Sequence, residues 1–83
     1  MMPNLERFEF FNQIYKAAEE LLQTQVIALV SAIAEQLELS EDVVARAILD
    51  LEKAGAVETT PEGDISSVKT QTVWMAVKAL WMS

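Results

Sequence analysis

The chain contains neither cysteine nor histidine among its 83 residues. Without cysteine there is no disulfide framework and no thiol nucleophile, and without histidine the usual general base and the commonest metal ligand are missing. The acidic pairs Glu19-Glu20 and Glu41-Asp42 are neighbours in sequence, so on a helix they point in different directions and do not share a proton or a metal ion. The composition therefore predicts a protein that is not an enzyme and has no metal or other cofactor.

Long hydrophobic runs, glycine and proline are also scarce. Two glycines and two prolines favour a compact helical body over a linker or a low-complexity tail. The longest apolar run, Val26 to Ala34 with Ser31 inside it, is about half of the roughly 20 residues that a membrane-spanning helix needs. The charged N-terminal segment is unlike a secretory signal. We therefore expect one small domain, residues 1–83, that is cytoplasmic and makes no membrane contact.

Positive charge is the third scarcity. Thirteen acidic residues against six basic ones give a net charge of −7, and a field of that sign repels phosphate backbones and anionic membranes at long range. The bases are spread along the whole chain, at Arg7, Lys16, Arg46, Lys53, Lys69 and Lys78. Because many nucleic-acid-binding proteins are acidic overall but keep a local basic stripe, the local pattern of charge decides the question.

Hydrophobic periodicity predicts the helices in the first half of the chain. The first helix is expected over residues 4–23, where Asn4 is a good N-cap and apolar residues recur at three- and four-residue steps. The segment Thr24–Val30 fits either a short strand or the start of the second helix. From Ala28 onward the helical repeat is the stronger of the two, and this helix is expected to end near Leu37.

The second half of the chain has clear start and stop signals. Ser40 is expected to cap a third helix, and Gly55 supplies the left-handed residue that ends it. Two short strands follow, with Pro61 and Gly63 placed as in a type I turn between them. The last helix is expected over residues 70–82.

The stretch from Leu39 to Glu58, LSEDVVARAILDLEKAGAVE, followed by the hairpin, resembles the winged helix-turn-helix family. The resemblance covers about residues 28–68, half of the chain, and rests on the capping serine, the closing glycine and three aliphatic residues expected to face inward, Val44, Ile48 and Leu51. It implies a mainly α fold made of four parts: an N-terminal helix (4–23), the helix-turn-helix (28–55), a small two-stranded wing (57–68) and a C-terminal helix (70–82).

One departure from the family pattern lies in the turn between the second and third helices. The turn is Leu37-Glu38-Leu39 and contains no glycine, although one residue in such a turn tends to adopt positive φ. Either the turn is longer than usual, or Glu38 carries some backbone strain.

In this family the outer side of the third helix enters the DNA major groove and the wing touches the DNA backbone. The corresponding face here consists of Asp42, Arg46, Leu49 and Lys53, with Ala45 and Asp50 beside them. The wing tip would point the carboxylates of Glu62 and Asp64 at phosphates. Specific binders commonly make roughly six to ten phosphate contacts, so DNA binding is disfavoured. We expect Arg46 and Lys53 to be solvated or paired with Asp42 and Asp50.

The C-terminal helix is apolar on all sides. From Val73 to Met82 it reads VWMAVKALWM, with Lys78 as its single charged residue, and such a helix is usually covered on more than one side. Its large side chains could complete the core of one chain by covering the aromatic residues of the first helix. We favour the other interpretation, since Trp and Met are enriched at interfaces: Val73, Val77 and Leu80 face the core, and the terminal helices form a dimer interface. Its predicted residues are Phe8, Phe11, Tyr15, Trp74, Met75, Trp81 and Met82.

The sequence therefore predicts a non-enzymatic, acidic winged-helix protein that acts through protein–protein contacts, as a homodimer or with another protein. Leu49, apolar on the outer side of the third helix, indicates a second contact surface. The alternative function is a DNA-binding transcriptional regulator, whose dimer would place Arg46 and Lys53 in adjacent grooves. A third is an acidic protein that occupies the nucleic-acid-binding site of a partner, suggested by the net charge and the acidic wing tip.

Overall fold

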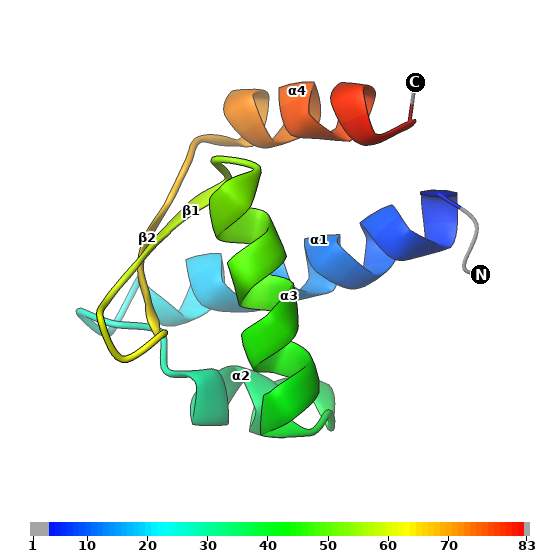
Figure 1. Cartoon of the computed structure of the whole chain (residues 1–83). Coiled ribbons are helices and arrows are strands. Elements are labelled where there is room, and N and C mark those ends of the chain that lie inside the picture. Colours follow the sequence, from blue (N-terminus) through cyan, green and yellow to red (C-terminus); the bar gives the residue numbers. More distant parts are fainter. Residues whose placement is uncertain (1–3, 83) are drawn as a thin grey trace.

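The computed structural model describes the backbone of residues 4–82 and the side chains of residues 7–77, 79 and 80. This part of the chain forms four helices and one antiparallel two-stranded sheet. Their order is α1 (Asn4–Leu21), α2 (Val30–Leu37), α3 (Glu41–Lys53), β1 (Val57–Thr59), β2 (Ile65–Val68) and α4 (Gln71–Met82). In Figure 1, α2 and α4 lie on opposite sides of α1, and α3 crosses α1 between them. The fold is therefore mainly helical, with the sheet at one end.

The segment before α2 is extended where the sequence predicted helix. Ala28 forms an antiparallel bridge with Ile65, with N···O distances of 2.8 and 3.0 Å, and α2 begins only at Val30. The prediction that the helix begins at Ala28 is therefore wrong by two residues. Ala28 is fully buried, and pairing both of its backbone polar groups with β2 avoids the cost of leaving them unsatisfied.

The connection between α2 and α3 is as short as the sequence suggested. Glu38 adopts φ 57° and ψ 44°, the left-handed conformation that is uncommon for a residue with a Cβ atom. Of the two expectations for this turn, strain at Glu38 is the one observed. Ser40 then caps α3 as predicted, because its side chain accepts a hydrogen bond from the N–H of Val43.

The hairpin follows α3 directly. Gly55 has φ +81° and reverses the chain, as its position after the helix predicted. The turn between the strands is closed by a hydrogen bond from the N–H of Gly63 to the carbonyl oxygen of Thr60, 2.9 Å long. The pairing of β1 with β2 is irregular between Glu58 and Thr59, so the hairpin bends close to its turn.

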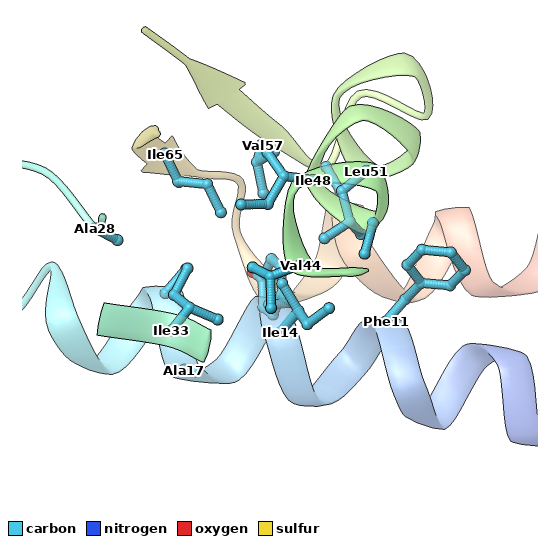
Figure 2. Close-up of a cluster of buried hydrophobic side chains, with 14 of the residues drawn as sticks. Phe11, Ile14, Ala17, Ala28, Ile33, Val44, Ile48, Leu51, Val57 and Ile65 are labelled. Carbon is cyan, nitrogen blue, oxygen red and sulfur yellow. The ribbon is translucent and has the colours of Figure 1, made fainter. Parts of the chain in front are cut away.

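The core lies where α1, α2, α3 and the sheet meet (Figure 2). Val44, Ile48 and Leu51 of α3 are buried, as their helical spacing predicted. Ile33 of α2 and Ile65 of β2 are also fully buried. No polar or charged side chain is buried in the described part of the chain, so the core is held together by apolar burial rather than by an internal polar network.

Candidate interaction surfaces

The contact between α1 and α4 is built around Trp74. Its ring stacks on Phe8 and on Tyr15, with centroid distances of 5.0 and 5.1 Å and interplanar angles of 20° and 10°. Its indole Nε1–H donates a 2.7 Å hydrogen bond to Oδ1 of Asn12. Trp74 is only 1% exposed, so α4 is fixed to α1 by an aromatic side chain whose polar atom is satisfied.

This arrangement corrects part of the predicted dimer interface. Phe8, Phe11, Tyr15 and Trp74 are buried inside one chain and are not available to a partner. The sequence was compatible with these side chains in the core of one chain or in a dimer interface, and the structure places them in the core. Of the other three predicted interface residues, Met75 is 44% exposed, whereas the side chains of Trp81 and Met82 lie outside the described residues.

The orientation of α4 about its axis also differs from the prediction. Val77 is buried as expected, but Val73 and Leu80 are 42% and 76% exposed, respectively. The reason is that Trp74 faces α1, and a residue three positions later shares that side of the helix whereas its immediate neighbour does not. Val73 and Leu80 are therefore partly or largely accessible to solvent instead of filling the core.

Tyr15 also connects α1 to the segment before α4. Its hydroxyl donates a hydrogen bond to the backbone carbonyl of Lys69. Burial raises the pKa of the Tyr15 hydroxyl, and the nearby carboxylate of Glu19 raises it further. Because the pKa is raised in the folded state, folding favours the neutral hydroxyl. The contribution of Tyr15 to the free energy of unfolding is therefore present below the ordinary tyrosine pKa and is lost as the pH rises through the raised pKa.

The outer face of α3 is exposed, as the sequence predicted. Asp42, Arg46 and Lys53 are exposed, and Leu49 is 52% exposed among them. Of the two expectations for Arg46 and Lys53, exposure to solvent is the one observed, because the ion pair within the described residues joins other side chains. The face therefore presents charges of both signs around an apolar centre.

The hairpin carries less free charge than its sequence suggested. Nζ of Lys69 lies 2.8 Å from Oε1 of Glu58. The hydrogen bond and the positive charge of Lys69 lower the pKa of the Glu58 carboxyl. Lys69 directly follows β2, so its pairing with Glu58 of β1 compensates the positive charge beside the hairpin.

Asp64 is not at the free tip of the hairpin, although its sequence position suggested that it was. Its Oδ1 accepts a 2.9 Å hydrogen bond from the N–H of Val30, the first residue of α2. An acidic side chain at a helix N-terminus satisfies an otherwise unpaired N–H and interacts favourably with the helix dipole. Asp64 therefore joins the hairpin to α2, and Glu62 is left as the exposed carboxylate of the predicted wing tip.

Replacing Asp64 by alanine is expected to lower the free energy of unfolding by about 1 kcal/mol, the usual effect of losing a helix-capping side chain. Glu62→Ala, two residues away at an exposed position, is the matched control and should change stability by less than about 0.5 kcal/mol. Urea unfolding followed by circular dichroism measures both variants. Equal effects of the two substitutions would contradict the capping role of Asp64.

The described residues present surfaces rather than cavities. They enclose no pocket, and no three acidic side chains among them gather where they could bind a metal ion. None of the described helices is both long and apolar enough to cross a membrane. What the described surface does present is the outer face of α3, the hairpin and the outer side of α4.

Comparison with known proteins gives no family assignment. No protein-family model, no curated protein and no solved structure matches the chain.

Proposed function

We propose that this chain is a winged-helix protein that acts through protein–protein contacts, as a homodimer, and not by catalysis. The fold assignment is supported by the order of its elements, in which two helices joined by a tight turn are followed by a hairpin whose first strand begins at Val57, two residues after Gly55. It is also supported by the Ser40 cap and by Val44, Ile48 and Leu51 in the core.

The observation that carries this proposal is the charge of the surface that would have to read DNA. The outer face of α3 offers two cations, Arg46 and Lys53, with Asp42 on the same face. The hairpin adds no uncompensated cation, because Lys69 is paired with Glu58 and the tip exposes Glu62. Specific DNA binding commonly involves roughly six to ten phosphate contacts, far more than this surface supplies.

A DNA titration tests the proposal. Anisotropy of labelled duplexes, one from the gene's own upstream region and one unrelated duplex of the same length, should show no sequence-dependent complex at about 150 mM salt. Any binding at low salt should be weak and should disappear steeply as salt is added, because it depends on few phosphate contacts.

The second candidate function, a DNA-binding transcriptional regulator, is favoured by one specific observation. Arg46 and Lys53 are exposed on one face of α3 and form no ion pair with a described residue. A sequence-dependent, nanomolar complex that is lost in Arg46→Ala would establish this function and overturn our proposal. Lys16→Ala removes the same charge from an exposed position on α1 and is the matched control.

The third candidate, an acidic protein that occupies the nucleic-acid site of a partner, loses support at the hairpin. Such imitation needs carboxylates that are free to meet the cations of the partner. Asp64 is engaged with α2 and Glu58 with Lys69. The predicted wing tip is thereby reduced to Glu62, so the overall charge of −7 is the remaining argument for this function.

A further inference from the structure

We propose that the outer side of α4 binds the same side of α4 in a second copy of the chain. This inference rests on the proposed function, since it names the surface and the partner of the homodimer. Here the outer side of α4 means the exposed residues Thr72, Val73, Met75, Ala76, Ala79 and Leu80. Figure 1 shows α4 at the edge of the molecule, with α1 along one of its sides.

The first argument is the composition of this exposed surface. The described residues of α4 that face α1 are Trp74 and Val77. After Thr72, every other described side chain of α4 is both exposed and apolar. A surface helix of a monomeric domain normally turns charged and polar residues outward, so this helix has the composition of one that is covered on a second side.

The second argument is the arrangement of large and small side chains. Thr72, Ala76 and Ala79 recur at steps of four and three, so they form one line along the helix. Met75 lies on one flank of this line and Val73 on the other. Small side chains between larger ones allow a second helix to approach closely, at the 8–10 Å axial separations typical of packed helices.

The distribution of acidic residues along the chain favours a second copy as the partner of this surface. All thirteen acidic residues lie between Glu6 and Asp64, and residues 65–83 contain two lysines and no acid. Two copies with a charge of −7 each repel one another most where their carboxylates approach within a Debye length, about 8 Å at physiological salt. The outer side of α4 itself carries no acidic residue, so two copies that meet through it place no carboxylate within the contact.

Charge also disfavours the other occupants of such a surface. A cationic protein would be attracted to the acidic remainder of the chain rather than to α4. An anionic membrane repels the chain, and helices that bind at membrane surfaces usually present several lysines and arginines, whereas α4 contains Lys78 alone. A second copy needs no such complementarity, because it brings the same uncharged surface.

The size of the contact sets its expected strength. A helix of 12 residues is about 18 Å long, and a contact along it is smaller than the roughly 800 Å² that each partner buries in a standard interface. We therefore expect association in the micromolar range and not in the nanomolar range.

Sedimentation velocity over about a hundredfold range of micromolar concentrations tests the inference on the full chain. The mean mass of the wild type should rise from the 9.3 kDa of one chain toward twice that value. Ala76→Glu places a carboxylate in the middle of the outer side of α4 and should raise the dissociation constant at least about tenfold. Glutamate is a good helix former and position 76 is exposed, so the variant should give the circular dichroism spectrum of the wild type.

Val26→Glu is the matched control, because it adds the same charge at an exposed apolar position outside α4 and outside the outer face of α3. It should associate as the wild type does. An equimolar mixture of Ala76→Glu with Ala76→Lys should recover the association, since position 76 lies at the middle of α4 and opposite charges would meet across a symmetric pair of helices.

Four results would overturn the inference. A wild type that stays at the mass of one chain throughout would remove the homodimer itself, while the DNA titration would still test whether the chain acts through proteins. A wild-type dimer that is unaffected by Ala76→Glu would retain the homodimer and exclude this surface. Dissociation by Leu49→Glu instead would move the interface to α3. Binding of the wild type to anionic or neutral vesicles, without self-association, would assign α4 to a membrane surface.

Discussion

Replacing Trp74 by alanine is expected to lower the free energy of unfolding by about 3–5 kcal/mol, the usual cost of removing a large aromatic side chain from a core. The substitution removes the ring that stacks on both Phe8 and Tyr15, and it leaves Oδ1 of Asn12 without its hydrogen-bond donor. Small domains are stable by about 5–15 kcal/mol, so the variant should be close to unfolding at room temperature.

Urea unfolding followed by far-ultraviolet circular dichroism measures this effect without interference from the fluorescence of Trp81. Trp74→Phe keeps an aromatic ring but loses the indole N–H that donates to Asn12, and should therefore cost less than the alanine variant. If Trp74→Ala cost less than about 1 kcal/mol, below the range for buried aromatic residues, the account of how α4 is attached to α1 would be wrong.

Replacing Ile65 by alanine is expected to cost about 2–5 kcal/mol. Ile65 is fully buried and pairs with Ala28 through two backbone hydrogen bonds. It also directly follows Asp64, which caps α2. Loss of its side chain leaves a cavity at the point where the hairpin, α2 and the segment before α2 meet.

Ile65→Val, which removes one methylene, gives a graded comparison and should cost about 0.5–1.5 kcal/mol. Hydrogen exchange of the hairpin amides should be faster in Ile65→Ala than in the wild type, because local opening becomes easier. Equal stability of the valine and alanine variants would show that the hairpin is not anchored through this side chain.

The elements with local signals were predicted well. Ser40 and Gly55 bracket α3 in the sequence, and the structure has both the cap and the left-handed residue at these positions. Strain at Glu38 was one of two expectations for a turn that contains no glycine, and the observed φ of 57° agrees with it. Signals of this kind lie within a few residues of the feature they determine, so one sequence is enough to find them.

The features that were missed depend on residues far apart in the chain. The bridge that delays α2 joins Ala28 to Ile65, and the cap on α2 comes from Asp64, 34 residues beyond Val30. Periodicity shows that a segment repeats like a helix, but it does not show which partner its first residues meet. The orientation of α4 was missed for a different reason. An almost uniformly apolar helix has no polar side that would indicate which of its residues face α1.

The candidate surfaces were predicted in part. The outer face of α3 is exposed as its spacing implied, since the inward residues of that helix are clearly apolar. The predicted interface of the terminal helices grouped Phe8, Phe11, Tyr15 and Trp74 with exposed residues such as Met75. The first four are buried inside the chain. Aromatic residues are common both in cores and at interfaces, so residue type alone does not separate the two.

Sedimentation velocity of the full chain mixed with a labelled duplex from its own upstream region, at about 150 mM salt, distinguishes action through proteins from action on DNA. We expect the protein to sediment as a concentration-dependent dimer, and the label to sediment as free duplex at every protein concentration. A label that sediments together with the protein, while the protein alone has the 9.3 kDa mass of one chain, would contradict the claim that this protein acts through contacts with proteins.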